Sequence, residues 1–276
     1  MRLATVRLGT RSHVARIDGE FAVLLAFDTL EDLIGTPGWE ELAARDDGTV
    51  IAANELVFGP LVSRPAKILC VGLNYRAHIR ELGRPTPEYP TLFAKFANSL
   101  IGPHDDIPLP PESDQVDWEA ELAIVIGQPC RRSTPEAATD AIAGYTVLND
   151  VSMRDWQWRT TQWLQGKSFE RSTPIGPVLV TRDEFTPHPD LELTCEINGE
   201  LVQSARTSDL LFGPAEIVSY ISQFTTLMPG DVIATGTPGG VGVARDPKRF
   251  LQAGDVVTTS ISGIGACLNT CVPEVA

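Results

Sequence analysis

The sequence predicts a mainly β fold of the α+β class, with a few peripheral helices. From residue 67 onward, short apolar runs are separated by turn residues, and the chain holds 23 Gly and 21 Pro among its 276 residues. Runs of this kind are typical of β-strands. No regular alternation of strands and helices supports a doubly wound parallel sheet. We therefore expect a packed β architecture.

Each apolar run of four to seven residues with turn residues at both ends is predicted to be a strand. These runs are residues 67–73, 122–126, 145–149, 178–181, 191–197, 231–235 and 256–261. Helices are predicted over residues 76–82, 135–141, 154–164 and 214–224. The last begins with Pro214, which the first turn of a helix tolerates because its missing N–H has no intrahelical partner there.

Residues 1–64 are predicted to form a small N-terminal α/β domain. Ala4, Val6 and Leu8 alternate with polar residues, as in a half-buried strand, and a second strand is expected over residues 21–25. Short helices are expected after the capping residue Thr29 and near residues 39–44. A segment with two prolines then predicts a boundary near residue 65. Residues 65–276 are predicted to form the second, larger domain, which is the catalytic one.

The charge balance narrows the classes of partner. Thirty-six acidic and 22 basic residues give a net charge of −14 and a pI near 4.7, which repels phosphate backbones and anionic lipids. No apolar run approaches the roughly 20 residues that cross a bilayer, and charge interrupts the apolar stretch that a secretory signal needs. We expect a cytoplasmic protein without nucleic-acid or membrane partners. The five cysteines are odd in number and scattered, which favours buried thiols over disulfides.

The sharpest local signal is the run DWEAELAIVIG over residues 117–127. In a strand, Glu119 and Glu121 point to the same face, because side chains alternate with period two. Asp150 follows another predicted strand and offers a third carboxylate. Three carboxylates suit a hard divalent cation such as Mg²⁺, Mn²⁺ or Ca²⁺. A solvated acidic face is the alternative, but the apolar run after Glu121 favours a site at a cavity mouth.

A second cluster lies on the helix predicted over residues 76–82. His78 and Glu81 are three residues apart and share a face of that helix. The carboxylate can therefore orient the imidazole, so that the other ring nitrogen acts as a general base. An ordinary surface ion pair is the alternative interpretation.

Two further segments offer contacts for an acidic substrate. Lys167 follows a stretch with three tryptophans, which are themselves assigned to packing, so its ammonium group is expected to be enclosed near the site. The glycine-rich loop over residues 236–242 matches neither a Walker loop nor a dinucleotide fingerprint. Its backbone amides and the Thr237 hydroxyl are candidate carboxylate ligands, and a plain turn is the alternative.

Together these segments resemble the fumarylacetoacetate hydrolase family, in its short bacterial-type form. The resemblance runs from about residue 67 to the C-terminus and depends on the shared order of several motifs. The motifs are Gly72-Leu73-Asn74-Tyr75 with His78 and Glu81, Phe93 with Lys95, Asp117-Trp118-Glu119-Ala120-Glu121, Asn149-Asp150, Arg154-Asp155 with Gln157, Gly166-Lys167-Ser168-Phe169 and Thr235-Gly236-Thr237-Pro238.

The resemblance implies a mixed β-sandwich roll, a homodimer, and a Mg²⁺ or Mn²⁺ ion held by Glu119, Glu121 and Asp150. It implies that substrates are 2-oxo acids or 1,3-dicarbonyl compounds, and that the segment with His78 and Glu81 forms a lid over bound ligand. The residues implied to line the substrate pocket are Arg154, Gln157, Lys167 and Thr237.

We predict a metal-dependent hydrolase that cleaves a carbon-carbon bond in an acylpyruvate-like acid. His78, oriented by Glu81, would deprotonate water, while Lys167 and Arg154 offset negative charge. The resemblance also implies two alternative activities, an oxaloacetate-type decarboxylase and a 2-hydroxyhepta-2,4-diene-1,7-dioate isomerase. A non-catalytic protein stabilised by a bound metal ion is the alternative from another class.

Overall fold

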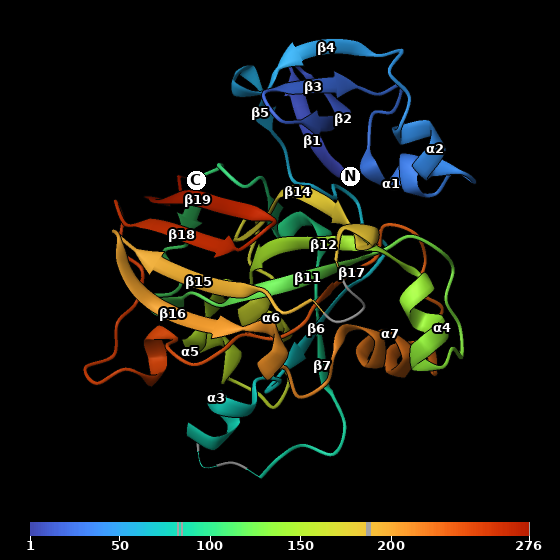
Figure 1. The fold of residues 1–276 in the computed structure, drawn as a ribbon. Helices are drawn as coiled ribbons and strands as arrows, with labels where there is room; N and C mark the ends of the chain where they lie inside the picture. The colour runs from blue at the N-terminus through green and yellow to red at the C-terminus, as the bar shows by residue number, and fades with distance from the viewer. Residues whose placement is uncertain (82, 84, 186–188, 276) are drawn as a thin grey trace.

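The computed structural model is built from two β-sheets that pack against each other, with short helices at the periphery (Figure 1). It describes residues 1–81, 83, 85–185 and 189–275, except for the side chain of Glu81. Strand β14 of the larger sheet lies against β19 of the smaller one. The mixed α+β, mainly β class expected from the sequence is confirmed.

The larger sheet has twelve strands and begins with the N-terminal segment. Its main path runs β4-β3-β2-β1-β14-β12-β11-β17-β6-β7, while β5 pairs with β1 and β8 pairs with β14. The strands are β1 (Arg2–Leu8), β2 (Arg11–Asp18), β3 (Phe21–Leu24), β4 (Thr49–Ala52), β5 (Val57–Phe58), β6 (Ile68–Gly72), β7 (Thr91–Lys95), β8 (Leu100–Ile101), β11 (Ala120–Ile126), β12 (Ile142–Asn149), β14 (Thr173–Thr181) and β17 (Val232–Ala234).

The smaller sheet has five strands in the order β16-β15-β18-β19-β9. They are β9 (Ile107–Leu109), β15 (Glu192–Ile197), β16 (Glu200–Arg206), β18 (Val256–Ile261) and β19 (Gly265–Pro273). A two-stranded ladder joins β10 (Val116–Asp117) to β13 (Ser152–Met153). Burial alternates along β18, whereas every residue of β11 and β12 is buried. The central strands are therefore covered on both faces, which explains their continuous apolar runs.

The helices are short. They are α1 (Leu30–Ile34), α2 (Trp39–Ala43), α3 (Arg76–Glu81), α4 (Pro135–Asp140), α5 (Arg154–Gln157), α6 (Leu164–Lys167) and α7 (Pro214–Ser222). The 3₁₀ turns are η1 (Ala53–Glu55), η2 (Ala97–Ser99), η3 (Arg182–Glu184), η4 (Thr207–Asp209) and η5 (Gly242–Ala244). Helix α7 begins at Pro214 as predicted, and the Glu216 carboxylate accepts from the N–H of Gly213.

One helix prediction is wrong. The helix expected over residues 154–164 is two helices, α5 and α6, separated by residues 158–163. The hydroxyl of Thr160 accepts from the backbone N–H of Gln162 at 3.3 Å and donates to its carbonyl oxygen. Side chains that bond nearby backbone groups compete with helix formation. This break lets α6 turn back toward α5.

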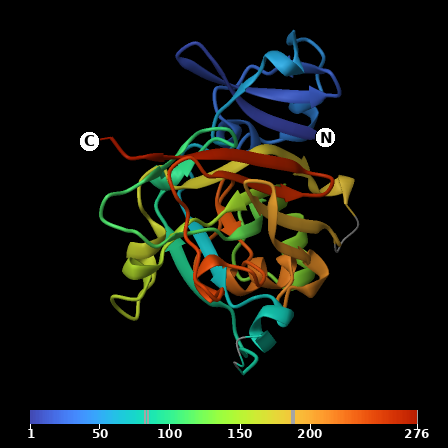
Figure 2. The same cartoon turned by 90° about the vertical axis from the view of Figure 1, so that its left-hand side faces the viewer.

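The N-terminal strands extend the main sheet (Figures 1 and 2). β1 pairs antiparallel with β14, so Arg2 lies opposite Val180. The predicted strand over residues 21–25 corresponds to β3, whereas β2, between β1 and β3, is not among the predicted strands. The domain boundary near residue 65 stays a prediction.

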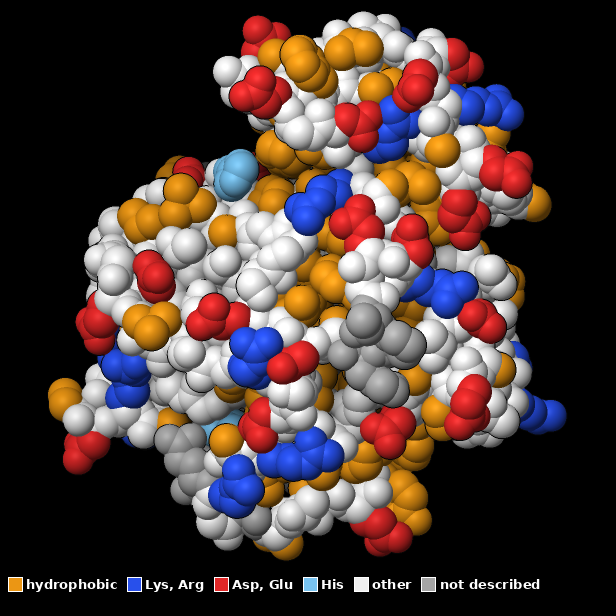
Figure 3. All heavy atoms as spheres, viewed as in Figure 1, with side chains coloured by type: hydrophobic (Ala, Val, Ile, Leu, Met, Phe, Trp, Pro, Cys, Tyr) orange, Lys and Arg blue, Asp and Glu red, His pale blue; other side chains and the backbone are white. Residues whose placement is uncertain are grey.

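The remaining global features concern the cysteines, the surface and membrane spans. All five cysteines are buried and unpaired with one another, as the sequence favours. Acidic and basic side chains are interspersed over the face shown in Figure 3, so the excess negative charge is spread across it. Among the described residues, no helix is long and apolar enough to cross a membrane.

Candidate metal and substrate site

Three carboxylates meet where β11 and β12 lie side by side. Ala120 pairs with Asn149 in their antiparallel ladder. Glu119 precedes β11 and Asp150 follows β12, and the N–H of Asp150 donates to the carbonyl oxygen of Glu119 at 2.8 Å. One ligand atom from each of Glu119, Glu121 and Asp150 lies within 4.8 Å of the others, and all three residues are buried. We call these three residues the acid cluster.

Buried cations bond the acid cluster. Lys167 Nζ lies 2.8 Å from both Glu119 Oε2 and Asp150 Oδ2. Arg154 Nη1 lies 2.6 Å from Glu119 Oε1, and Lys95 Nζ lies 2.7 Å from Asp150 Oδ1. Every carboxylate oxygen of Glu119 and Asp150 is therefore bonded to a cation.

The carboxyl groups of the acid cluster differ in pKa. Burial alone would raise the pKa of Asp150, but Lys167 and Lys95 outweigh burial and lower it to about 2. Burial, followed by the charges of Asp150 and Glu119, raises the pKa of Glu121 well above its usual range. An ionised Glu121 therefore needs additional positive charge nearby.

The side chains fit a hard divalent cation. Among these described groups, four buried carboxylates, those of the acid cluster and Asp117, face three buried cations, Lys95, Arg154 and Lys167. With Glu121 ionised, these groups would carry one uncompensated negative charge, which a bound cation would offset. Mg²⁺ and Mn²⁺ prefer oxygen ligands and keep several positions for water or substrate. The buried acid cluster is consistent with such a site.

Close packing between α5 and α6 brings Lys167 to the acid cluster. A Cβ atom added at Gly166 would lie 2.3 Å from the backbone nitrogen of Gln157, so the two helices approach as closely as glycine allows. Lys167 is buried, as expected from the sequence, and its Nζ lies 5.0 Å from the centre of the Phe93 ring. Such an aromatic face attracts an ammonium group.

A cavity of about 80 Å³ opens onto the acid cluster. Six of the nine residues predicted for the site line it: His78, Glu119, Glu121, Gln157, Lys167 and Thr237. Two more, Arg154 and Asp150, reach the site through the ion pairs described above. Trp163, expected from the sequence to contribute only to packing, also lines the cavity.

The pair formed by His78 and Glu81 lies on α3. His78 is 8% exposed and lines the cavity. The side chain of Glu81 lies outside the described residues, so its contact with His78 stays a prediction.

Three buried residues of the site have no role predicted from the sequence: Lys95, Asp117 and Gln203. Lys95 was part of the family resemblance, but its bond to Asp150 joins strands far apart in sequence. Asp117 accepts from Arg154 Nε at 2.8 Å and from the N–H of Gly242 at 2.7 Å. The sequence signal that indicates a role for Asp117 is its position two residues before Glu119.

The third residue is Gln203. Its Nε2 donates to Thr237 Oγ1 at 2.9 Å, and its Oε1 accepts from the N–H of Ala120 at 3.0 Å. The Thr237 hydroxyl donates to the carbonyl oxygen of Ala120 at 3.0 Å. Gln203 comes from β16, and no local motif marked it.

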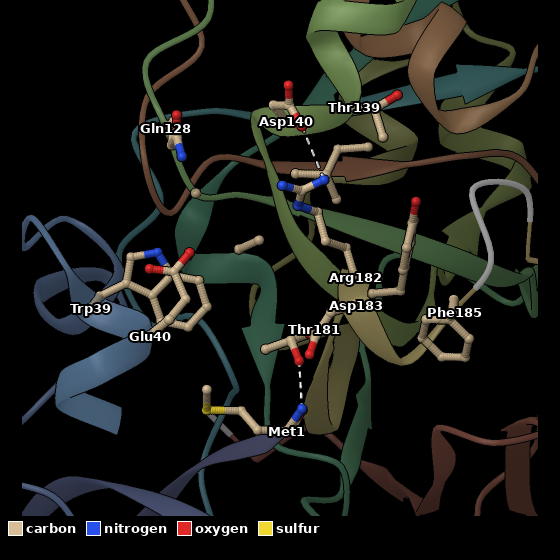
Figure 4. A pocket seen from close by; sticks show the side chains of 14 residues that line it. Met1, Trp39, Glu40, Gln128, Thr139, Asp140, Thr181, Arg182, Asp183 and Phe185 are labelled. Carbon is tan, nitrogen blue, oxygen red and sulfur yellow. Dashed lines mark hydrogen bonds and ion pairs between the residues drawn. The ribbon is translucent and has the colours of Figure 1, made fainter. Parts of the chain in front are cut away.

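A second cavity, of about 390 Å³, lies elsewhere (Figure 4). Trp39 and Glu40 of α2 line one side of it, and Arg182 pairs with Asp140 across 3.1 Å on another. Its lining includes no residue predicted for the site. Although this cavity is larger, no acids of the described part of the chain converge on a common point there, whereas Glu119 and Glu121 of such a group line the smaller cavity.

The fold and the acid cluster define a β-sandwich protein whose site is consistent with a divalent cation. Residues 67–272 match the family model described as fumarylacetoacetate hydrolase, C-terminal. The chain is similar to the mitochondrial oxaloacetate tautomerase FAHD2B of Bos taurus, with 48% identity over 228 residues, covering 81% of this chain and 72% of the relative.

Two solved structures are similar over nearly the whole chain. The fumarylacetoacetate hydrolase of Exiguobacterium antarcticum is 34% identical with a TM-score of 0.90, covering 99% of this chain and 100% of that one. The 2-hydroxyhepta-2,4-diene-1,7-dioate isomerase of Mycobacterium marinum is 35% identical with a TM-score of 0.83, and both chains are covered completely. The chain therefore belongs to the fumarylacetoacetate hydrolase family of enzymes, as its motifs indicate.

Proposed function

We propose that this enzyme catalyses the enol-keto isomerisation of a short 2-oxo dicarboxylic acid of the oxaloacetate class. The observation that carries the proposal is one small cavity lined by His78 and by two members of the acid cluster, Glu119 and Glu121. His78, which can carry a proton, therefore lines the same cavity as carboxylates suited to a metal ion that would chelate a 2-oxo acid. The names of the bovine and mycobacterial relatives both describe isomerisation of an unsaturated or enolised dicarboxylic acid.

Hydrolysis of a carbon-carbon bond, the first expectation from the sequence, has less support. The bovine relative, at 48% identity, carries a tautomerase name, and the Mycobacterium marinum structure carries an isomerase name, whereas the Exiguobacterium antarcticum structure, at 34% identity, carries a hydrolase name. The tautomerase name of the bovine relative favours a four-carbon acid over a longer acyl chain.

The proposed reaction balances without a co-reactant. The enol oxygen loses a proton, its C–O bond becomes C=O, the C=C bond becomes a single bond, and the adjacent carbon gains a proton. Glu119, Glu121 and Asp150 would hold a divalent cation, which would supply charge stabilisation at the oxygen that loses its proton. His78, which is largely buried and lines the cavity, carries the proton between the substrate atoms.

Basic groups of the chain compensate the substrate charge. Arg154 Nη2 is buried and has no hydrogen-bond partner among the described residues. It is therefore a donor available to an anionic oxygen. Lys167 lies between Glu119 and Asp150, where its ammonium group is close to any oxygen held at the acid cluster.

Thr237 has a more restricted role than the sequence suggests. Its hydroxyl already donates to the Ala120 carbonyl oxygen and accepts from Gln203. To donate to a substrate carboxylate, the hydroxyl must rotate away from Ala120. Thr237 therefore contributes to binding through a change of hydrogen-bond partner.

The test follows the enol form of oxaloacetate by ultraviolet absorbance, with Mg²⁺ or with EDTA. We expect rapid loss of the enol with Mg²⁺, without matching release of pyruvate. Pyruvate release at the same rate would favour a decarboxylase, and turnover of an acylpyruvate alone would favour the hydrolase. Mg²⁺-dependent melting without turnover of any of these acids would favour the non-catalytic alternative.

A further inference from the structure

One peptide group lies between the acid cluster and the segment that carries His78. The N–H of Gly236 donates to Glu121 Oε2 at 2.6 Å. The carbonyl oxygen of Thr235, at the other end of the same peptide group, accepts from Asn74 Nδ2 at 2.7 Å. The group is planar, and hydrogen bonds at its two ends polarise each other. Asn74 is thus one peptide group away from a member of the acid cluster.

The side chain of Asn74 is buried and fully engaged. Its Nδ2 also donates to the carbonyl oxygen of Phe212 at 3.0 Å, and its Oδ1 accepts from the N–H of Phe212 at 2.9 Å. Its own carbonyl oxygen accepts from the N–H of Leu211 at 2.7 Å. Helix α3, which carries His78, begins two residues later. Asn74 therefore fixes the point from which α3 starts.

The backbone on both sides of this contact is unusual. Gly236 has φ +105°, and an added Cβ would lie 2.9 Å from the Cβ of Asn74 and 3.0 Å from the carbonyl oxygen of Val71. Leu73 has φ +55°, which is uncommon for a residue with a side chain. Conformations of this kind persist where surrounding contacts hold them, often at functional sites.

Helix α3 has other attachments that do not touch this peptide group. Asp209 Oδ2 accepts from the N–H of Ala77 at 2.9 Å. The guanidinium group of Arg76 donates to the carbonyl oxygens of Leu210 and Leu211. These contacts hold α3 against residues 209–211. They provide a comparison in which α3 is loosened while the link to Glu121 is kept.

We propose that Asn74 is a positioning residue that couples metal binding at the acid cluster to the placement of His78. This inference depends on the metal site of the proposed function. A cation on Glu121 fixes that carboxylate, which holds the peptide group of Thr235 and Gly236 and, through it, Asn74. Helix α3 is therefore more firmly held in the Mg²⁺-bound protein than in the metal-free protein.

The test measures amide hydrogen exchange over residues 74–80, with and without Mg²⁺, while calorimetry measures Mg²⁺ binding to the same samples. Asn74→Asp keeps an acceptor for the N–H of Phe212 but removes the donor to Thr235. Asp209→Ala is the matched control. In the wild-type protein we expect Mg²⁺ to slow exchange at least about fivefold, the lower end of usual coupling between sites.

Asn74→Asp should bind Mg²⁺ yet lose the Mg²⁺-dependent slowing of amide exchange. Asp209→Ala should exchange faster than wild type both with and without Mg²⁺, and it should keep the Mg²⁺-dependent slowing. Binding of Mg²⁺ to wild type with unchanged exchange overturns the inference, as does a Mg²⁺-dependent slowing that survives in Asn74→Asp. If Asn74→Asp does not fold, Asn74→Ser replaces it. The comparison of wild-type exchange with and without Mg²⁺ tests the inference in either case. Absence of Mg²⁺ binding to wild type overturns the proposed function as well.

Discussion

Lys95 Nζ lies 2.7 Å from Asp150 Oδ1, and both side chains are completely buried. Lys95 ends β7, and Asp150 follows β12 in the middle of the same sheet. The other oxygen of Asp150 is bonded to Lys167. Asp150 is thus held as an ionised carboxylate by two lysines, one of which also bonds Glu119. This arrangement keeps one member of the acid cluster charged and oriented.

Replacing Lys95 with methionine should destabilise the metal-free protein. The substitution leaves a buried carboxylate with one cation fewer, and breaking a buried pair in this way typically costs about 3–5 kcal/mol. Denaturant unfolding in EDTA measures the change. Arg206→Gln is the control, because its pair with Asp190 is exposed and should leave the unfolding midpoint unchanged. Equal midpoints for both variants would contradict the assigned role of Lys95.

The stability of the metal-free protein should fall as pH rises above the ordinary range of a glutamate. The folded-state pKa of Glu121 is raised, first by burial and then by Asp150 and Glu119. Its contribution is therefore complete below the unfolded pKa of about 4.5 and is lost as pH rises through the folded pKa. Thermal melts in EDTA from about pH 5 to 8 should show the decline, and Glu121→Gln should flatten it. An equally steep decline in Glu121→Gln would assign it to other groups.

His78→Ala should separate binding from catalysis. Because His78 lines the cavity but is not a member of the acid cluster, the variant should bind Mg²⁺ as wild type does. Loss of a general acid-base usually lowers turnover about 10²–10⁴-fold. Enol turnover and calorimetry measure the two properties, with Glu119→Gln as the variant that loses both. Full isomerisation by His78→Ala would remove His78 from the mechanism.

Gly236→Ala should destabilise the protein more than Gly254→Ala. Both glycines have positive φ, a conformation that costs a residue with a side chain about 1–2 kcal/mol. A Cβ at Gly236 also meets Asn74 and Val71, whereas nothing lies within 4 Å of a Cβ at Gly254. Overpacking adds about 1–3 kcal/mol to the first variant. Equal unfolding midpoints for the two variants would show that the backbone near Gly236 shifts to accept the added Cβ at little cost in stability.

The sequence predicts the acid cluster because its geometry is local. Period-two alternation relates Glu119 to Glu121, and the end of the next strand in the chain places Asp150 beside them. Strand alternation holds here even though β11 begins one residue after Glu119. The family and the fold class followed from the order of such short motifs. The homodimer and the assigned roles of individual site residues stay predictions.

The parts that the sequence did not predict depend on long-range pairing. Lys95 meets Asp150 through the sheet order, and Gln203 reaches Thr237 from the other sheet. No periodicity in the chain encodes either contact. The break near Thr160 was missed because it depends on a side-chain hydrogen bond that competes with the helix.

The most direct test titrates Mg²⁺ into metal-free wild-type protein and into Asp150→Asn, recording heat of binding and the rate of enol oxaloacetate isomerisation on the same samples. The account predicts that the rate rises with the same midpoint as binding in wild type, and that both are weakened at least about tenfold in Asp150→Asn, a change of about 1.4 kcal/mol. Full turnover in EDTA, or unaltered Mg²⁺ binding by Asp150→Asn, would contradict it.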